Sequence, residues 1–337
     1  MKTTRSQSRH LIKRLGLSAA ILACFSLSNA FAMDKVKFQL DWLPGGDKAP
    51  VYVGIEKGFF KAEGIEVEVA SGRGSNDAIN KIATGNADIG LSDLVALLMS
   101  KQQNQVPVSA VYSVFSKAPH AFFVLEGSGI NTVSDVANKK IATSPYTSSN
   151  VFLPLLLKVN QVDENSIQLV KADPGALNPM LIRGNTDVVI SWITDKVKYQ
   201  DQAIQAGKTL RVLPWYDAGL EFYSTSVIAA DDFLEQHPDV VKRFTKAFQK
   251  AVVYTWQHPE ESGEIVHKKV PEVDAKTATD TIISIKKLVH NSVSDQDGLG
   301  EITPERLATT WKWTATAQDI KVESFDPETA IQRQFMP

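Results

Sequence analysis

Short apolar runs and helical apolar repeats alternate along most of the chain. The short runs predict strands, and the apolar residues spaced three and four apart after them predict helices. Strands are expected at Val36–Leu40, Ile65–Ala70, Lys140–Thr143 and Ile167–Lys171, and helices at Pro50–Glu63, from Ser75, at Asn150–Asn160 and from Ala176. Because each strand leads through a loop into a helix, the pattern predicts an α/β fold with parallel sheets and right-handed crossovers.

An internal repeat relates the two halves of this pattern. Residues 85–92 read Gly-Asn-Ala-Asp-Ile-Gly-Leu-Ser, and residues 184–191 read Gly-Asn-Thr-Asp-Val-Val-Ile-Ser. Both follow an apolar helical segment and lead into a short apolar strand, so each half has the order β-loop-α-β-loop-α-β. Convergence on a common β-α pattern is the alternative explanation. The repeat predicts two Rossmann-like lobes, and we interpret Asp88 and Asp187 within it as structural turn carboxylates.

The last third of the chain has helical rather than β-α spacing. Three amphipathic segments are expected at Asp231–Trp256, Ala275–Leu288 and Pro304–Ala317, where they would pack against the first lobe. The dipeptides His237-Pro238 and His258-Pro259 are typical of helix boundaries, because the residue before a proline disfavours helical backbone.

The N-terminal 32 residues have the three parts of a secretory signal peptide. They contain five basic and no acidic residues, an apolar run at Leu15–Phe25, and the small-residue sequence Ala30-Phe31-Ala32. We therefore expect residues 1–32 to be removed and the protein to be exported to the periplasm. The alternative is a lipid anchor at Cys24, since Ile21–Cys24 loosely resembles a lipoprotein box.

Charge and cysteine content narrow the possible partners. The chain has 36 basic and 38 acidic residues, and loss of the leader's five basic residues moves its formal net charge from −2 to −7. An acidic chain without a basic tract argues against nucleic acid as a partner. The only cysteine lies in the leader, which leaves no disulfide and no cysteine-based metal site.

The loops after the predicted strands are rich in polar and aromatic residues. In parallel sheets, ligands bind beyond the carboxyl ends of the strands, so these loops would line one cleft if the lobes face each other. The candidate ligand-binding residues there are Asp41, Trp42, Lys48, Arg73, Ser75, Ser92, Asp93, Tyr146, Thr147, Ser148, Ser149, Trp192 and Asp195. Two further candidates, Glu221 and Tyr223, come shortly before the expected return to the first lobe.

The residue types leave two ligand classes open. Trp42 and Trp192 could hold a flat ligand against their faces, although both could instead pack at a domain edge. The carboxylates Asp41, Asp93 and Asp195 favour a planar, hydrogen-bonding heterocycle. Lys48, Arg73 and the hydroxyl cluster would suit a sulfonate, a carboxylate or another anion equally well. The histidines lack the spacing of a metal site or a triad, so we expect no catalytic residue and no cofactor, and only His120 is a candidate for the cleft.

Residues 36–95 resemble the N-terminal part of the NMT1/THI5-like family of periplasmic substrate-binding proteins. The matching segments are Leu40-Asp41-Trp42-Leu43-Pro44, Val51-Tyr52-Val53-Gly54, Gly58-Phe59-Phe60, Glu63-Gly64-Ile65-Glu66-Val67, Ser71-Gly72-Arg73-Gly74 and Ala83-Thr84-Gly85-Asn86-Ala87-Asp88-Ile89-Gly90. The resemblance implies a type II periplasmic-binding-protein fold, with two lobes joined by two hinge strands and the ligand cleft between them. The hinges would lie near Ala121–Leu125 and Glu221–Val227, with lobe 1 at 34–120 plus 226–337 and lobe 2 at 121–225.

The resemblance also implies a function. We expect a monomeric solute-binding protein that captures a small molecule and delivers it to an ABC permease with its ATPase. A ligand-sensing receptor subunit and a pyrimidine-precursor synthase of the same fold are the alternatives. The chain departs from the thiamine-precursor members, which have a histidine where it has Lys48, and from the fungal synthases, whose cysteine-rich motif it lacks.

Overall fold

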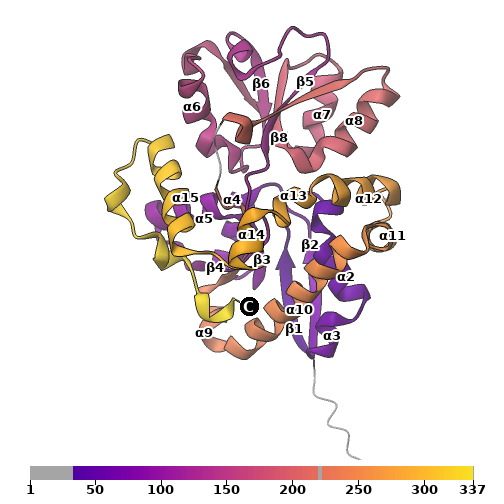
Figure 1. Ribbon diagram of the computed structural model, residues 1–337, viewed down its shortest axis with the longest axis vertical. Helices are drawn as coiled ribbons and strands as arrows, with labels where there is room; N and C mark the ends of the chain where they lie inside the picture. Colours follow the sequence, from indigo (N-terminus) through magenta and orange to yellow (C-terminus); the bar gives the residue numbers. More distant parts are fainter. Residues whose placement is uncertain (1–32, 219–221, 337) are drawn as a thin grey trace, which may run out of the picture. The chain divides into compact units, whose positions relative to one another are not determined.

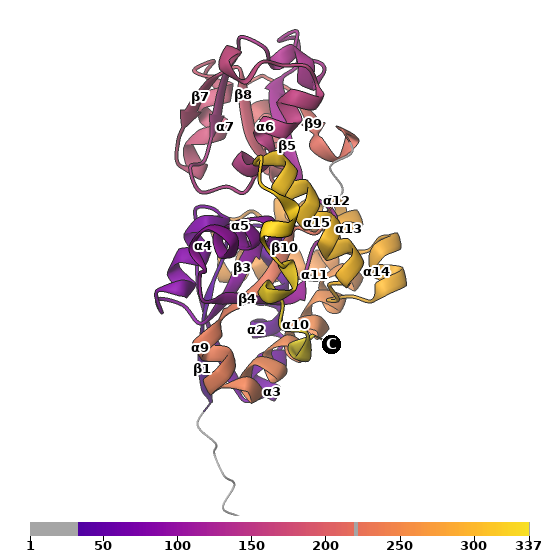
Figure 2. The same ribbon diagram turned by 90° about the vertical axis from the view of Figure 1, so that its left-hand side faces the viewer.

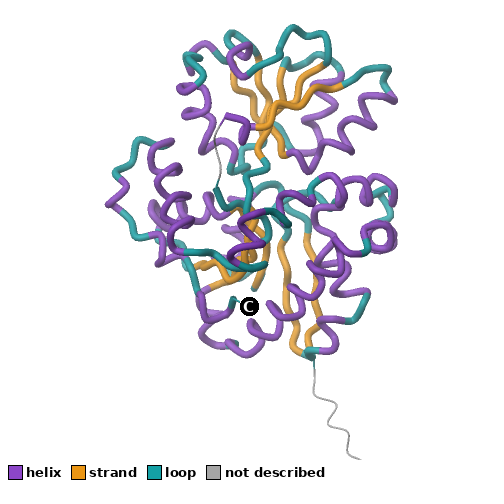
Figure 3. The backbone as a smooth tube through the Cα atoms, viewed as in Figure 1, coloured by secondary structure: helices purple, strands orange, loops and turns teal. Residues whose placement is uncertain are grey.

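The computed structural model describes residues 33–218 and 222–336. The predicted signal peptide, with Cys24, lies outside these described residues, as does Glu221. The strands form two separate five-stranded sheets, with the helices around them (Figure 3). We call the two sheets, each with the loops at its strand ends, the first lobe and the second lobe. The exact lobe boundaries given above remain a prediction.

The first sheet has the strand order β2-β1-β3-β10-β4 (Figure 1). Its strands are β1 Asp34–Gln39, β2 Ile65–Ala70, β3 Ile89–Asp93, β4 Val108–Ser113 and β10 Thr225–Ala230. The strand β1 pairs parallel to β2 and β3, whereas β10 pairs antiparallel to β3 and β4. The expected strand at Ile65–Ala70 is confirmed to the residue.

The second sheet repeats this arrangement, with the order β7-β6-β8-β5-β9 (Figure 2). Its strands are β5 His120–Leu125, β6 Lys140–Thr143, β7 Gln168–Lys171, β8 Val188–Trp192 and β9 Leu210–Pro214. Here β6 pairs parallel to β7 and β8, and β5 is antiparallel to both of its neighbours. In each sheet, the antiparallel strand is the first strand that the chain enters after crossing from the other sheet.

This topology shifts the first crossing from its expected place. Residues 121–125 belong to β5, which pairs along its length with β8 and β9, so they are interior to the second sheet. The chain instead crosses between Ser113 and His120, and it returns between Pro214 and Thr225. An apolar run reads the same in sequence whether it crosses between sheets or lies inside one, and only its pairing partners distinguish the two.

The helices follow the expected order. Before β10 they are α2 Ala49–Glu56, α3 Phe59–Ala62, α4 Ser75–Ala83, α5 Leu94–Asn104, α6 Ser149–Val159, α7 Pro174–Ile182 and α8 Lys196–Gln205. After it come α9 Asp231–Gln236, α10 Pro238–Gln257, α11 Pro259–Lys269, α12 Ala275–Ser284, α13 Lys286–Val289, α14 Ser292–Asp297 and α15 Pro304–Ala317. Short 3₁₀ turns include η2 Gly46–Lys48 and η5 Ile193–Asp195, both beside the site described below.

Three expected helices are interrupted. The segment 50–63 divides at Gly58, whose positive φ of 72° ends the first helix in a conformation that glycine tolerates best. The segment 231–256 divides at His237-Pro238, and His258-Pro259 separates α10 from α11, as predicted for these dipeptides. The segment 275–288 divides at Ile285.

Apolar side chains pack on both faces of the first sheet. Along β10, Val227 and Ala229 contribute to one core and Ile228 to another, as the alternation of side chains along a strand requires. On the first face, Phe244 and Phe248 of α10 stack on Phe38 of β1, with ring centroids 5.7 and 6.4 Å apart. The amphipathic helix predicted from residue 231 therefore covers the first lobe, as expected.

The sequence repeat occupies equivalent positions in the two sheets. Lys37 N donates to Asp88 Oδ2, and Lys140 N donates to Asp187 Oδ2, each at 2.8 Å. Each aspartate N donates in return to the carbonyl of the same lysine, at 3.0 and 2.9 Å. Both carboxylates thus fasten a neighbouring strand to the turn before β3 or β8, which confirms their structural interpretation.

Candidate functional site

A pocket lies where the strand-end loops of the two lobes meet. Its walls come from Asp41, Trp42, Asp47, Gly74 and Ser75 of the first lobe and from Thr147, Ser191, Trp192, Thr194 and Asp195 of the second. The space free for solvent inside amounts to about 10 Å³. That is about the room that one water molecule needs. The conformation is therefore closed, and an organic ligand can enter only if the walls separate.

Two tryptophans form the aromatic part of the pocket. Trp42 follows β1 and is partly buried, and Trp192 ends β8 with 9% of its surface exposed. The indole nitrogen of Trp192 donates to Ser149 Oγ at 3.2 Å, which fixes the orientation of the ring. The two positions are not equivalent in the two sheets, because Trp42 follows β1, which corresponds to β6, whereas Trp192 ends β8, which corresponds to β3. The pocket thus presents one aromatic side chain from each lobe.

Lys48 is buried beside the pocket and held by two carboxylates. Its Nζ lies 2.6 Å from Asp41 Oδ1 and 2.9 Å from Asp47 Oδ2, and only 1% of the side chain is exposed. Burial alone would lower the pKa of Lys48, but Asp41 and Asp47 outweigh it and hold the pKa above its usual value. The ammonium is therefore charged, and its charge is compensated within the protein.

Asp195 lies on the opposite wall. Its Oδ2 accepts a hydrogen bond from Ser191, the residue before Trp192. The pKa of Asp195 is raised to about 6, mainly by burial and also by the nearby Asp47, while Ser191, Lys198 and Lys48 oppose the rise. This carboxyl is the least compensated charge in the wall, since its only hydrogen-bond donor in the described part of the chain is a neutral hydroxyl.

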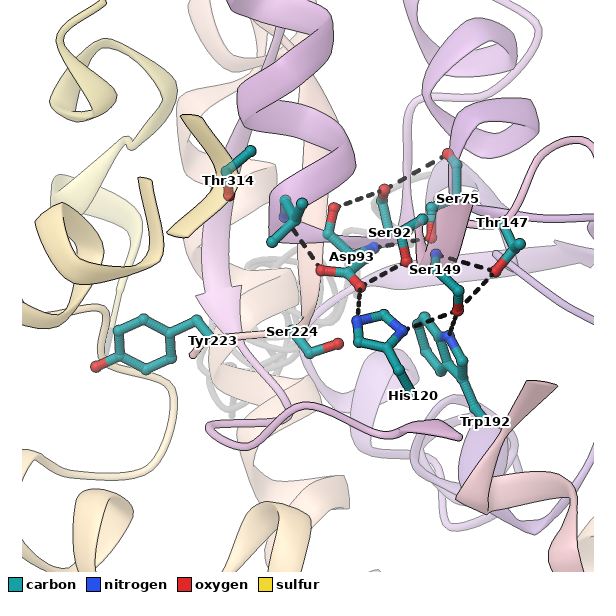
Figure 4. Close-up of polar contacts among 12 residues, drawn as sticks. Ser75, Ser92, Asp93, His120, Thr147, Ser149, Trp192, Tyr223, Ser224 and Thr314 are labelled. Carbon is teal, nitrogen blue, oxygen red and sulfur yellow. Dashed lines mark hydrogen bonds and ion pairs between the residues drawn. The ribbon is translucent and has the colours of Figure 1, made fainter. Parts of the chain in front are cut away.

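A buried polar network joins the two lobes behind the pocket (Figure 4). Asp93, at the end of β3, caps α5 through Val95 N at 3.1 Å and accepts from Ser148 Oγ at 2.6 Å. Its Oδ2 also lies 3.3 Å from His120 Nε2. The other ring nitrogen of His120 is 2.9 Å from Ser149 Oγ, the hydroxyl that Trp192 contacts. The network therefore connects the aromatic wall of the pocket to a carboxylate of the first lobe.

The residue types of this network are those of an acid–base–nucleophile triad, but their environment does not suit catalysis. His120 and Ser149 are fully buried, and the Ser149 hydroxyl accepts from both Trp192 and Thr147. A nucleophile must be reachable by the atom that it attacks. The observed hydrogen bonds instead position Trp192 and tie the lobes together.

Backbone contacts also join the lobes at the edge of the pocket. Asn76 N donates to the Tyr146 carbonyl at 3.1 Å, and Ser144 Oγ donates to the Arg73 carbonyl at 2.8 Å. Gly74 passes so close that a Cβ atom there would lie 2.3 Å from the Tyr146 carbonyl oxygen. This contact, like the one at Asp93, exists only between closed lobes.

The structure brings together only some of the predicted site residues. Six of them line the pocket: Asp41, Trp42, Ser75, Thr147, Trp192 and Asp195. Five others lie behind its walls: Lys48, Ser92, Asp93, Ser148 and Ser149. The hydroxyl of Ser92 is 3.2 Å from the Asp93 carbonyl, so it supports the network rather than the pocket.

The other candidates lie elsewhere. Arg73 is 52% exposed, pairs with Asp77 at 3.1 Å and lies over the ring of Tyr146, so both side chains belong to the contact between the lobes. Tyr223 points away from the pocket (Figure 4), and its hydroxyl contacts Thr303 at 3.4 Å. Tyr223 comes just before β10, and there it lies against α15 rather than in the cleft. Glu221 lies outside the described residues.

Four pocket residues were not among the candidates: Asp47, Gly74, Ser191 and Thr194. All lie in or beside loops that the sequence had marked as strand ends. Ser191 is the last residue of the second repeat, equivalent to Ser92, so the repeat itself carried the signal. Asp47 and Gly74 gave none, because their roles depend on contacts with Lys48 and Tyr146.

Within residues 33–218 and 222–336, no group of three or more histidine, cysteine, aspartate or glutamate side chains is placed to hold a metal ion. In the same part of the chain, no helix is both long and apolar enough to cross a membrane.

The sequence of this chain is similar to a known protein family and to named proteins. A family model described as NMT1/THI5 like matches residues 46–262, more than half of the chain. The chain is 24% identical over 277 residues to the 4-amino-5-hydroxymethyl-2-methylpyrimidine phosphate synthase of Legionella pneumophila, covering 80% of this chain and 85% of that protein. It is 22% identical over 318 residues to the riboflavin-binding protein RibY of Chloroflexus aurantiacus, covering 90% of this chain and 87% of that protein.

Solved structures share the fold. The periplasmic aliphatic sulphonate binding protein SsuA of Escherichia coli superposes with a TM-score of 0.66 at 16% identity, over 90% of this chain and 92% of that one. At this identity the likeness shows the architecture alone. That architecture is the type II fold of ABC-type periplasmic binding proteins, as expected from the sequence.

Proposed function

Because the chain belongs to the NMT1/THI5-like family and has the fold of ABC-type solute-binding proteins, we propose that it is an exported binding protein of an ABC importer. It captures a planar nitrogen heterocycle between its lobes and delivers it to a membrane permease with its ATPase. In this proposal the chain acts in the periplasm as a monomer, after removal of residues 1–32, and performs no chemistry on the ligand.

The observation that carries the proposal is the pairing of Trp42 with Trp192 in one pocket formed by both lobes. Aromatic side chains bind flat rings by stacking or edge contacts, and each such contact adds about 0.5–1.5 kcal/mol beyond area burial. The carboxylates and hydroxyls around them, Asp41, Asp195 and Thr147, suit the N–H groups of a heterocycle.

The names of two relatives support the same ligand class. The Legionella protein is named for a pyrimidine and the Chloroflexus protein for riboflavin, and both compounds contain planar nitrogen heterocycles. The synthase name also raises an enzymatic role, but the triad-like network here is fully buried and bonded to Trp192. The binding role therefore has the stronger support.

The mechanism follows from the closed pocket. Open lobes admit the ligand, and contacts to both lobes then favour closure about the two crossings. Since a ligand shifts an equilibrium only by its differential contacts, residues of both walls must touch it for closure to be linked to binding. Trp42 on one wall and Trp192 on the other meet this requirement.

A sulfonate or carboxylate ligand is the second candidate, and the pocket gives it less support. No basic side chain is among the described residues that line the pocket. Lys48 is compensated by Asp41 and Asp47, and Arg73 lies outside, paired with Asp77. An anion would therefore be buried against carboxylates, which costs several kcal/mol.

Thermal unfolding of residues 33–337 tests the proposal. The protein is refolded from denaturant to remove carried-over ligand and is then screened against heterocycles, sulfonates, carboxylates and amines. A ligand at a hundredfold excess over its dissociation constant adds about 2.7 kcal/mol, a shift of several degrees at this size. We expect a shift with planar heterocycles that is lost in Trp42→Ala and Trp192→Ala.

Trp313→Ala is the matched control, because Trp313 is partly buried in a core away from the pocket. It should lower the unfolding temperature of the free protein but keep the ligand-induced shift. A shift confined to sulfonates or carboxylates, or one that persists in both pocket variants, would overturn the proposal.

A further inference from the structure

The charges around the pocket are unbalanced. Three carboxylates line its walls, those of Asp41, Asp47 and Asp195, and no lysine, arginine or histidine among the described residues does so. Lys48 lies just behind and is shared between Asp41 and Asp47. One ammonium against two carboxylates leaves this side of the pocket negative, and Asp195 adds a further carboxylate on the other side.

Asp41 provides an independent observation. Only 1% of its surface is exposed, and its Oδ1 faces Lys48. Its Oδ2 is buried in the pocket wall without a hydrogen-bond partner among the described residues. A buried acceptor of this kind is costly unless a donor reaches it. Since the side chain lines the pocket, a ligand there can supply that donor, in place of the single water molecule for which the closed pocket has room.

The aromatic walls have the same preference. The face of a tryptophan ring carries negative electrostatic potential and attracts cations within about 6 Å of its centroid. Lys48 Nζ lies 5.9 Å from the centroid of Trp192, so this ring already neighbours one cation on the protein side. Trp42 and Trp192 would therefore favour a positively charged ring over an anionic one of the same shape.

The approach to the pocket is also acidic. A groove of about 500 Å³ shares Asp47, Thr194 and Asp195 with the pocket and is formed by loops and helices of both lobes. Further carboxylates line it, those of Asp201, Glu272 and Asp274, against one basic residue in the described lining, Lys198. A cleft lined by one sign of charge concentrates ions of the opposite sign.

We propose that the ligand is a cation: a planar nitrogen heterocycle with a positive charge, held between Trp42 and Trp192 with that charge against Asp41 and Asp195. The inference rests on the proposed function and narrows its ligand class. It distinguishes this chain from a protein of the same fold that is named for sulphonate, which is an anion, because the pocket of this chain is lined by carboxylates.

Three rings of nearly the same shape test the sign of the charge directly: 1-methylnicotinamide, a permanent cation; nicotinamide, which is neutral; and nicotinate, an anion. Binding to refolded residues 33–337 is measured by isothermal titration calorimetry. We expect 1-methylnicotinamide to bind at least about tenfold more tightly than nicotinamide, and nicotinate to bind more weakly than both.

Asp195→Asn keeps the size of the side chain and its contact with Ser191 but removes the charge. It should weaken binding of 1-methylnicotinamide about tenfold and change that of nicotinamide by less than about threefold. Asp232→Asn removes an equal charge from an exposed position at the start of α9, away from the pocket, and should change neither.

The outcomes separate the two proposals. Equal or tighter binding of nicotinamide or nicotinate than of 1-methylnicotinamide would overturn the cationic ligand and leave the heterocycle-binding function in place. Equal losses for the cation in Asp195→Asn and Asp232→Asn would also overturn it, because they would reflect net charge rather than the pocket. Failure of all three rings to bind, while a neutral heterocycle gives a thermal shift, would overturn the cationic ligand alone. Failure of every heterocycle in the thermal screen would overturn both proposals.

Discussion

At the scale of single residues, the charged side chains at the pocket fall into two groups: those paired with an opposite charge, and one without such a partner. Lys48, Asp41 and Asp47 form a buried cluster in which opposite charges lie within hydrogen-bonding distance. Asp195 has only a serine hydroxyl as its donor in the described structure. Buried charges without an opposite partner lower stability, and proteins retain them mainly where function requires them. Asp195 is therefore the residue at which stability and ligand binding should oppose each other.

Asp195→Asn should stabilise the ligand-free protein at neutral pH by about 2 kcal/mol. The groups that face this carboxyl are Ser191, Asp47, Lys198 and Lys48, together with Tyr199, and burial sets the net direction, raising its pKa to about 6. Because the folded pKa exceeds the unfolded value, the stability that its protonation contributes is present below about pH 4 and is lost as pH rises through about 6.

Urea unfolding of both proteins across this range is the measurement. The variant and the wild type should have similar free energies of unfolding near pH 4, and the variant should become the more stable as the pH rises through about 6. A variant that is less stable than the wild type at pH 7 would contradict the assigned environment of Asp195.

At the scale of elements, the two halves reuse one β-α-β unit with the same turn chemistry. Asp88 and Asp187 each accept from a backbone N–H of the neighbouring strand, Lys37 in β1 and Lys140 in β6, at the same distance. Gly85 and Gly184, three residues earlier in each motif, share a φ of 73° that favours glycine. Equal local geometry in two sequence-distant places indicates that the repeat encodes the turn itself.

Asp88→Asn and Asp187→Asn should therefore cost nearly the same stability, about 1 kcal/mol each, because each replaces a charged acceptor of a backbone N–H by a neutral one. Chemical denaturation monitored by circular dichroism gives both values. Asp217→Asn, at an exposed position in the turn after β9, is the control and should change stability by less than about 0.5 kcal/mol. Costs that differ by more than about 1 kcal/mol would show that the two turns are not equivalent.

At the scale of the whole molecule, closure depends on backbone contacts between the lobes. Gly74 has φ and ψ of 152° and 163°, a region that other residues rarely adopt, and it lies against the Tyr146 carbonyl. The network at Asp93, His120 and Ser148 makes a second contact between the lobes. Gly74 lines the pocket, but its close contact is with the Tyr146 backbone rather than with Trp42 or Trp192, so this contact can be perturbed without changing either tryptophan.

Gly74→Ala should hinder closure, since its Cβ would lie 2.3 Å from the Tyr146 carbonyl oxygen of the other lobe. We expect at least a tenfold loss of affinity for the heterocycles identified by thermal unfolding, and a larger radius of gyration in small-angle X-ray scattering. Gly298→Ala is the matched control, because Gly298 has a similar backbone, with φ of 100° and ψ of 150°, and its Cβ would meet Glu301 Cγ at an ordinary 3.4 Å.

The control should bind with wild-type affinity even though both substitutions strain the backbone. A Gly74→Ala protein that closes and binds like the wild type would show that this contact is not made in the ligand-bound state. Equal losses of affinity in both variants would point to backbone strain rather than to a contact between the lobes.

The sequence by itself determined the helices and strands, and it placed the site at the carboxyl ends of the parallel strands. Strands and helices follow from apolar spacing, and the His-Pro dipeptides mark helix ends, because these signals act within a few residues. The break at Gly58 was not predicted. The same local reasoning placed Trp42 and Trp192 at strand ends. The repeat added the two-lobed plan, which agrees with the two five-stranded sheets of the structure.

The tertiary structure alone decided which polar groups are available to a ligand. Lys48 and Arg73 were candidates for binding an anion, yet Asp41, Asp47 and Asp77 occupy them. His120 had no sequence partner, and its contacts come from Asp93 and Ser149, which lie on other strands and helices. Local spacing cannot encode such meetings, because they depend on how loops distant in the chain approach once both sheets have formed and the lobes have closed.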